Sequence, residues 1–372
     1  MNWQEWLMNF AKLNLRVKIL FRVDVTQQIG TGHFMRCLTL ADALSQRCAQ
    51  IRFITRHLPV YLQDMLRDRG YEFRMLESPA NEKIDDLAHS HWLGTTQRSD
   101  AEEALQLLSD RTWEWLVVDH YALDARWESI LRQRVKNILV IDDIADRQHD
   151  CDILLDQNFY ADMESRYSGK VPEHCRLLLG PRYALLRDEF RQLHKQVKPR
   201  SGPAKRIFVF FGGVDIDNYT GRAIDALVDL DMNGLHVDVV VGAQHPYREQ
   251  IQAACAEHRF TCYVQTDRMA ELMAAADLAI GAGGSATWER CCLGLPTLTV
   301  SLANNQTEIA KGLDLSVACQ YVGSQETATV KVLNKAVVEL LKDNNRLQAI
   351  STQAYSFVDG LGVDRVSKEL LS

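Results

Sequence analysis

The sequence predicts an α/β protein built from two Rossmann-like domains that face a cleft. Short β-branched runs alternate with longer amphipathic segments, and this alternation is typical of βα units and parallel sheets. The pattern starts twice with a strand followed by a glycine turn, first near residue 17 and again near residue 206. The length of 372 residues also exceeds the size that a single hydrophobic core usually serves.

The first half of the chain supplies one predicted sheet and its helices. The expected strands cover residues 17–23, 50–55, 71–76, 115–119, 138–142, 153–156 and 176–179. Amphipathic patterns between them predict helices at residues 35–47, 59–69, 99–109 and 125–135.

The second half restarts the pattern after a polar, basic segment that contains Pro199, Gly202 and Pro203 and reads as an interdomain linker. Further strands are expected at residues 206–211, 237–241, 261–264, 278–282 and 297–300. The predicted organisation is an amino-terminal extension (1–15), a first domain (16–191), a linker (192–205) and a nucleotide-binding domain (206–372).

Composition narrows the class of protein. The net charge of −7 argues against nonspecific nucleic-acid binding, which needs a basic surface. No apolar run approaches the ~18 residues of a membrane span, and the amphipathic extension lacks the cationic start of a signal peptide. Nine cysteines without a C-x-x-C pair indicate reduced thiols in a cytoplasmic protein, with neither a zinc site nor a thioredoxin-like redox centre. The oligomeric state stays open.

The first glycine loop is the strongest local signal. Gly30 and Gly32 follow a strand and precede a helix, a geometry that suits a phosphate group. Met35 stands where a dinucleotide-binding loop has a third small residue, so the loop fits NAD poorly. His33 lies at the crest of the loop, which places a group that titrates near neutral pH beside the expected phosphate. The alternative is a histidine that only packs or caps the turn.

A second glycine cluster follows the predicted strand at 278–282. Its glycines allow a pyrophosphate to approach the backbone, and the amides that follow Gly284, from Ser285 and Ala286 onward, would meet it at a helix start. Glu289 falls one turn into that helix, where a carboxylate can accept hydrogen bonds from ribose hydroxyls. The alternative is a tight turn with a solvated glutamate. No Asp-x-Asp metal motif accompanies this loop.

Several motifs in collinear order resemble one family. They are G-x-G-H-x-x-R-C at 30–37 and the segments 118–121, 151–158, 183–190, 212–215 and 283–289. Together they are similar to the UDP-2,4-diacetamido-2,4,6-trideoxy-β-L-altropyranose hydrolases of pseudaminic acid biosynthesis. That family has the GT-B fold and is similar to the lipid II N-acetylglucosaminyltransferase. The likeness runs from about Val17 to about Asp314.

The resemblance implies a metal-independent, inverting hydrolase without a cofactor, in which water attacks the anomeric carbon of a UDP-linked sugar and UDP leaves. It makes His33 the base and Tyr121 a second catalytic residue, while Asp119 either orients the base or caps a turn. Arg187, expected in an amphipathic helix, would contact the substrate. The substrate- and nucleotide-binding candidates are Gly30, Gly32, Arg187, Gly284, Ser285, Ala286, Glu289, Asn305 and Met269.

Other functions fit the same loops. An inverting GT-B glycosyltransferase would use the same UDP-sugar donor and pass the sugar to an acceptor instead of water. A nucleotide-sugar 2-epimerase and a non-catalytic nucleotide-sugar-binding protein are further alternatives. The pair Asp142 and Asp143 is interpreted as a strand end and a cap, and His149 and His174 as surface residues.

Overall fold

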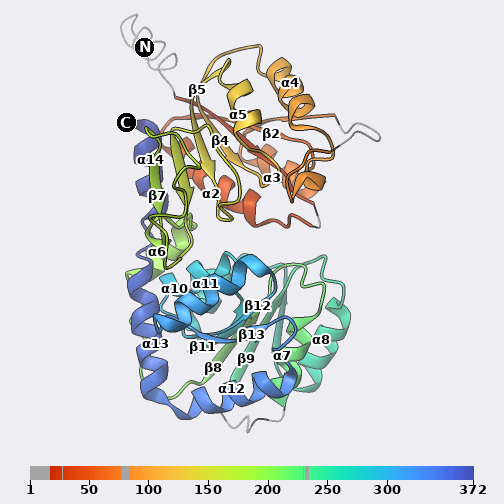
Figure 1. The fold of residues 1–372 in the computed structure, drawn as a ribbon. Coiled ribbons are helices and arrows are strands. Elements are labelled where there is room, and N and C mark those ends of the chain that lie inside the picture. The colour runs from red at the N-terminus through yellow and green to blue at the C-terminus, as the bar shows by residue number, and fades with distance from the viewer. Residues whose placement is uncertain (1–16, 27, 78–83, 229, 231–233) are drawn as a thin grey trace, which may run out of the picture. The chain divides into compact units, whose positions relative to one another are not determined.

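The computed structural model describes residues 17–26, 28–77, 84–228, 230 and 234–372, so the predicted extension at 1–15 lies outside the described residues. The chain divides into two compact units (Figure 1). The first unit comprises the chain up to Gln157 together with Asp162–Leu185 and Val363–Ser372. The second unit comprises Asn158–Ala161 and Leu186–Gly362.

The first unit contains a seven-stranded parallel sheet in the order β3-β2-β1-β4-β5-β6-β7. Its strands are β1 (Lys18–Val23), β2 (Gln50–Thr55), β3 (Glu72–Met75), β4 (Trp113–Asp119), β5 (Val135–Ile141), β6 (Ile153–Asp156) and β7 (Arg176–Leu179). Val23 at the end of β1 pairs with Asp119 at the end of β4. The segments that follow these neighbouring parallel strands therefore emerge at the same sheet edge, where α/β proteins bind ligands.

Helices cover both faces of this sheet. They are α2 (Gly32–Gln46), α3 (Val60–Asp68), α4 (Gln97–Leu107), α5 (Ala125–Leu131), α14 (Gly362–Leu371) and the 3-10 helices η1 (Ser90–Trp92) and η2 (Pro181–Tyr183). Alternate strand residues face opposite sides. Phe21 packs with Phe34 of α2 in one core, whereas Leu20 packs with Trp127 of α5 in the other.

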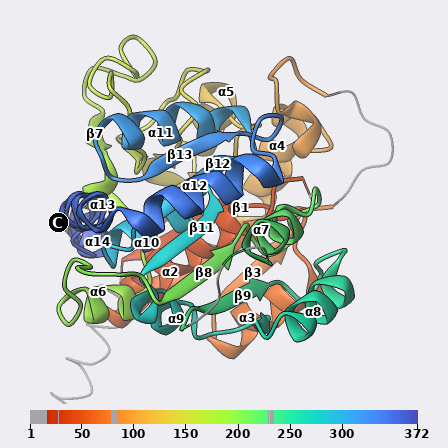
Figure 2. The same ribbon diagram turned by 90° about the horizontal axis from the view of Figure 1, so that it is seen from below.

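The second unit contains a six-stranded parallel sheet in the order β10-β9-β8-β11-β12-β13 (Figure 2). The strands are β8 (Arg206–Phe210), β9 (His236–Val241), β10 (Thr261–Val264), β11 (Leu278–Ala282), β12 (Thr297–Ser301) and β13 (Gln320–Ser324). The helices are α6 (Asp188–His194), α7 (Tyr219–Val228), α8 (Arg248–Glu257), α9 (Met269–Ala275), α10 (Ala286–Cys292), α11 (Asn304–Leu315), α12 (Val330–Lys342) and α13 (Asn344–Phe357). One core joins strand residues such as Val209 to Ile224 of α7 and Leu333 of α12.

The α/β class with two parallel sheets is confirmed. The first helix starts earlier in the structure than predicted, and this difference changes the position of His33. It begins at Gly32 rather than Met35, so His33 lies in the first turn of α2 and not at the crest of a loop. The earlier start was not predicted because glycine has no side chain and therefore adds nothing to the apolar periodicity by which a helix is recognised in the sequence.

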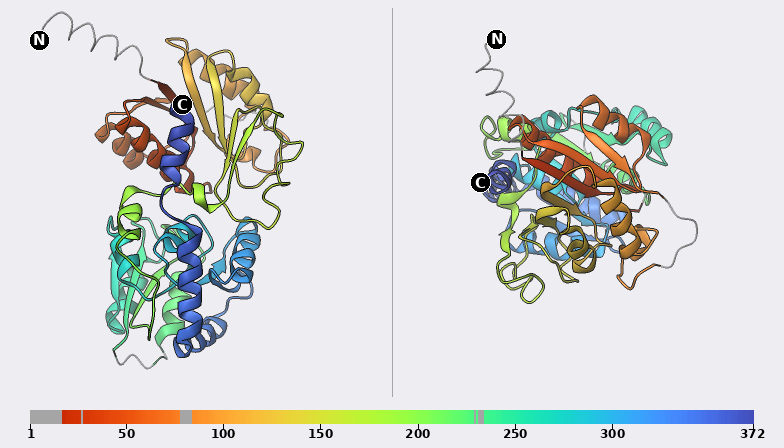
Figure 3. Two further views of the ribbon diagram at one scale, coloured as in Figure 1. Left: turned by 90° about the vertical axis from the view of Figure 1, so that its left-hand side faces the viewer. Right: turned by 90° about the horizontal axis from the view of Figure 1, so that it is seen from above.

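The division into units differs from the predicted boundaries: Asn158–Ala161 and the chain from Leu186 to Gly362 belong to the second unit, and Val363–Ser372 belong to the first. Helix α6 extends to His194, into the segment expected to be a linker. Helix α14 belongs to the first unit, because Val363, Val366 and Leu370 pack into the core that contains Phe34. Figure 3 shows α14 beside the strands of that unit. These apolar residues of α14 recur at helical spacing, which predicts a buried helix face but not the core against which that face packs.

Candidate active site

The structure brings His33 and Asp119 into direct contact in the first unit. Gly30 adopts a left-handed φ of +73°, which favours glycine, and its N–H donates to the carbonyl of Thr26 at 2.9 Å. This turn sends the chain from β1 into α2, whose first turn carries His33. The Nδ1 atom of His33 lies 2.6 Å from Oδ1 of Asp119 at the end of β4.

Arg36 holds the Asp119 carboxylate from the other side. Its Nε donates to Oδ2 at 2.6 Å and its Nη2 to Oδ1 at 2.7 Å. Burial of Asp119 opposes ionisation, but the charges of Arg36 and His33 hold the pKa of Asp119 well below its usual range. Asp119 is therefore a buried carboxylate with a fixed orientation.

The ionised Asp119 determines which nitrogen of His33 carries the proton. A carboxylate only accepts hydrogen bonds, so the short contact places a proton on Nδ1 of His33. Nε2 of the neutral ring then has a free lone pair, and Asp119 stabilises the imidazolium that forms when Nε2 takes a proton. This is the arrangement of an oriented general base.

Tyr121 lies next to this pair but its hydroxyl is engaged. The ring of Tyr121 meets that of His33 edge-on, with centroids 4.8 Å apart, and its hydroxyl donates to Oδ1 of Asp143. Arg36 donates to Oδ2 of the same carboxylate at 3.2 Å. Burial and the Asp143 charge raise the pKa of Tyr121 well above its usual value. The phenol therefore stays protonated.

Sequence reasoning missed the parts that Arg36 and Asp143 play here. Arg36 stands in the quoted motif three residues after His33, a spacing that puts both on one face of a helix, yet no role was assigned to it. Asp143 was interpreted only as part of a strand end and cap. Its neighbour Asp142 does cap the turn, because its Oδ2 accepts from the N–H of Ala145 at 2.9 Å. Asp143 instead faces Arg36 and Tyr121.

The second glycine cluster lies in the second unit, after β11. The N–H of Gly283 donates to the carbonyl of Val300 at 3.0 Å. A Cβ atom at position 283 would lie 3.3 Å from Gln306, whereas a Cβ atom at position 284 would meet its nearest neighbour, also Gln306, only at 3.8 Å. Ser285 is exposed and Ala286 half-buried. The backbone at Gly284 and Ser285 is thus approachable, as a phosphate site requires.

Glu289 and Arg187 lie together on this unit. Nη2 of Arg187 is 3.8 Å from Oε1 of Glu289, and Nη1 is 3.0 Å from Oε1 of Glu189. Burial raises the pKa of Glu289, and the charges of Arg187 and Arg290 partly oppose this shift. Arg187 precedes α6 instead of lying inside a helix, which corrects the prediction. Asp188 and Glu189 favour a helix start after Arg187, because acidic residues are stabilised in a first turn.

The remaining nucleotide-binding candidates are spread over other elements of the second unit. Asn305 is exposed in the first turn of α11, and Met269 begins α9 with its side chain buried in the protein. The N–H groups of Thr287 and Trp288 already donate to the carbonyls of Gly284 and Ser285, at 2.9 and 3.2 Å, so few backbone amides remain at the start of α10. The roles of these residues stay predictions.

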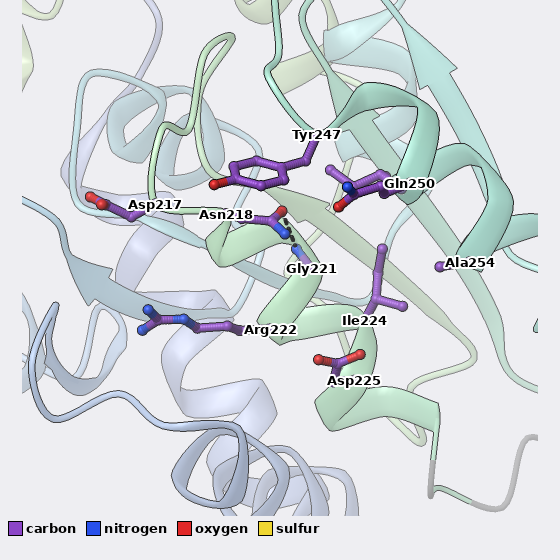
Figure 4. Close-up of a pocket in the computed structure, with 10 residues that line it drawn as sticks. Asp217, Asn218, Gly221, Arg222, Ile224, Asp225, Tyr247, Gln250 and Ala254 are labelled. Carbon is purple, nitrogen blue, oxygen red and sulfur yellow. Dashed lines mark hydrogen bonds between the residues drawn. The ribbon is translucent and has the colours of Figure 1, made fainter.

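A separate cavity of about 340 Å³ lies between α7 and α8 (Figure 4). Its walls include Asp217, Arg222 and Tyr247. It contains none of the predicted site residues. The Arg222 guanidinium is already occupied, because it lies 4.2 Å from the centroid of the Tyr219 ring and donates to the Tyr219 hydroxyl.

Two further observations concern the described part of the chain. No helix there is long and apolar enough to cross a membrane. No three His, Cys, Asp or Glu side chains among those residues group as ligands for a metal ion.

His174 is exposed as expected, but the interpretation of His149 as a surface residue is wrong. It is buried, and its Nδ1 lies 2.7 Å from Oε1 of Glu128.

Comparison with known proteins agrees with this fold. Residues 206–364 match the glycosyltransferase family 28 C-terminal domain. The chain is 27% identical over 299 residues to the UDP-2,4-diacetamido-2,4,6-trideoxy-beta-L-altropyranose hydrolase of Campylobacter jejuni, covering 80% of this chain and 96% of that protein. It is 25% identical over 350 residues to the spore coat polysaccharide biosynthesis protein SpsG of Bacillus subtilis, covering 91% of this chain and 93% of the relative.

Among solved structures, MurG of Acinetobacter baumannii is similar in fold. The TM-score is 0.65 at 15% identity, and the match covers 96% of this chain and 99% of the other. The predicted resemblance to the hydrolase is confirmed, and the fold is that of the GT-B glycosyltransferases.

Proposed function

We propose that this protein hydrolyses a UDP-linked 2,4-diacetamido-2,4,6-trideoxy sugar and releases UDP, as a step in the biosynthesis of pseudaminic acid or a related nonulosonate. The observation that carries the proposal is the contact of His33 with a buried, ionised Asp119 that Arg36 fixes in place. The similarity to the Campylobacter jejuni hydrolase supports the substrate class.

The reaction needs one proton acceptor and one leaving group. Nε2 of His33 removes a proton from water while the water oxygen forms a bond to the anomeric carbon. The bond between that carbon and the diphosphate oxygen breaks, and its electron pair leaves with UDP. Attack from the side opposite UDP inverts the anomeric configuration. Asp119 favours the imidazolium of His33 that results.

The second unit supplies the candidate nucleotide-binding groups. Gly283 is closely packed and Gly284 is open, so the backbone at Gly284 and Ser285 can approach a diphosphate. The Glu289 carboxylate can accept hydrogen bonds from the ribose hydroxyls, and the Arg187 side chain beside it can offset negative charge. We propose that these groups, with Asn305, bind UDP without a metal ion.

The free thiols of the chain support a proposal about its location. All nine cysteines are free, including Cys151 and Cys175, whose sulfur atoms are 3.5 Å apart. We propose that the enzyme works in the cytoplasm, where thiols stay reduced.

Hydrolysis and transfer are separated by incubating the purified protein with the UDP-diacetamido sugar alone. A hydrolase releases UDP and free sugar in equal amounts without an added acceptor. In water enriched in ¹⁸O, cleavage at the anomeric carbon yields unlabelled UDP, whereas attack at phosphorus labels the nucleotide. Proton NMR of the first-formed anomer, taken before mutarotation, tests inversion. UDP release that depends on a glycan acceptor would instead establish the transferase.

A further inference from the structure

A cluster of aromatic rings lies beside His33 in the first unit, and the mechanism proposed above uses none of them. Trp92 of η1 stacks on Tyr121 with centroids 5.3 Å apart and planes inclined by 24°. The ring of His89 contacts both, at 4.7 Å from Trp92 and 5.3 Å from Tyr121. The Trp92 ring is itself 6.3 Å from that of His33.

The cluster presents uncharged, partly open ring surface. Trp92 and His89 are half-buried, whereas Tyr121 is only 5% exposed. Burial lowers the pKa of His89, and the attraction of Asp146 does not offset it. His89 is therefore a neutral aromatic ring at physiological pH. Two half-buried, uncharged rings thus lie beside the base, the indole of Trp92 and the imidazole of His89, whose Nδ1 is buried without a hydrogen-bond partner among the described residues.

The segment that carries these rings is anchored at the start of α4. The N–H of Gln97 donates to Oδ2 of Asp85 at 2.5 Å, and Oγ1 of Thr96 caps the helix by accepting from the N–H of Ser99 at 3.1 Å. The rings are consequently positioned before any ligand arrives, which reduces the entropy lost on binding.

We propose that Trp92 and His89 determine specificity by packing against the methyl of an N-acyl group on the sugar carbon next to the anomeric carbon. This inference rests on the proposed function, because the anomeric carbon must be within reach of water held at His33. Substituents one carbon away then lie within a few ångströms of the neighbouring rings. A hydroxyl against these ring faces loses hydrogen bonds to water, whereas a methyl group gains from leaving water.

The kinetic test compares the 2-acetamido substrate with a UDP-sugar that carries a hydroxyl at the same carbon. Trp92→Ala should lower kcat/KM for the acetamido substrate about 10- to 100-fold, the range for an apolar contact of this size, with little change for the hydroxyl analogue. Trp92→Phe should restore most of the loss. His91→Ala is the matched control, because His91 is an exposed ring on the same 3-10 helix. An equal loss on both substrates would overturn the inference.

A binding measurement keeps this test independent of turnover. In saturation-transfer NMR with UDP-N-acetylglucosamine, the acetyl methyl should receive saturation from the wild-type protein. Its signal relative to uracil H6 should fall by more than half in Trp92→Ala. If the protein shows no hydrolase activity but its methyl signal still depends on Trp92, the proposed function is refuted and the inferred contact of the rings with the acetyl methyl stands. An unchanged ratio, or no methyl saturation in the wild type, refutes the aromatic site itself.

Discussion

Replacing Asp119 by asparagine tests the central pair of the site with almost no change in size. In the wild type, the two carboxylate oxygens accept from Nδ1 of His33 at 2.6 Å and from Arg36 at 2.6 and 2.7 Å. Asparagine offers one oxygen and one NH₂ group, so it cannot accept from all three donors. If the amide oxygen faces Arg36, the NH₂ group faces His33 and forces the ring proton onto Nε2.

The expected effect of Asp119→Asn follows from that change of tautomer. A proton on Nε2 removes the lone pair that accepts the proton of water, and the imidazolium loses its carboxylate partner. A positioned base contributes about 10²–10⁴-fold, and the same substitution in a comparable histidine–aspartate pair costs about 10⁴-fold. We therefore expect kcat to fall 10²–10⁴-fold, which is roughly 2.7–5.4 kcal/mol of activation free energy. The affinity for UDP should stay within about threefold, because the change removes no contact of the second unit.

The assay is UDP release at saturating substrate, with UDP affinity measured by calorimetry. Asp42→Asn is the matched control. Asp42 lies on helix α2, which also carries His33 and Arg36, but it accepts from Arg69 at 3.2 Å and from Tyr71 at 2.7 Å, away from His33. Because Arg36 would lose a buried charged partner, circular dichroism melting must show that Asp119→Asn is folded. A folded variant that retains more than a tenth of the wild-type kcat would refute the proposed role of Asp119.

Further predictions concern the base, the acid limit of stability, the nucleotide site and metal ions. His33→Asn should lower kcat about 10²–10⁴-fold with UDP affinity unchanged; near-normal kcat would assign the base elsewhere. The pKa of Asp119 is lower in the folded protein than its usual value of 3.8. Asp119 therefore contributes to the unfolding free energy above pH 3.8, and this contribution is lost as the pH falls from 3.8 through the folded pKa. The unfolding free energy of the wild type should accordingly drop more between pH 6 and pH 3 than that of Asp119→Asn, and parallel curves from urea titrations would contradict this. Glu289→Ala should weaken UDP binding by roughly ten- to hundredfold, the value of hydrogen bonds to a charged acceptor, whereas an unchanged calorimetric Kd would remove Glu289 from the site. EDTA should leave activity unchanged, and rescue by Mg²⁺ or Mn²⁺ after a loss would disprove a metal-independent reaction.

The sequence identifies most of the fold because its signals are local. Strands β2, β6 and β7 match their predicted bounds, since each is a short apolar run between polar segments. The βα alternation predicts that the strands are parallel, so side chains that follow them are expected along one edge of the sheet. Only the structure places β1 beside β4, and this pairing brings His33 and Asp119 together although they are 86 residues apart.

The missing parts of the site depend on information that is not local. Asp143 follows a strand in the same way as its neighbour Asp142, and nothing in the local pattern says which carboxylate turns toward Arg36. Trp92 comes from a segment between β3 and α4 with no periodic pattern of its own. Its position against Tyr121 is set by tertiary packing. Pairings of this kind become visible only once the chain is folded.

The position of α14 constrains the order in which the protein can be made. Val363, Val366 and Leu370 complete a core whose other members include Phe34 and Phe53, more than 300 residues earlier in the chain. The ribosome therefore produces the whole second unit before the first can bury its apolar surface under α14. During that interval, the apolar surface that α14 later covers must stay exposed to water or to a chaperone. Completion of the first unit is thereby coupled to translation of the second.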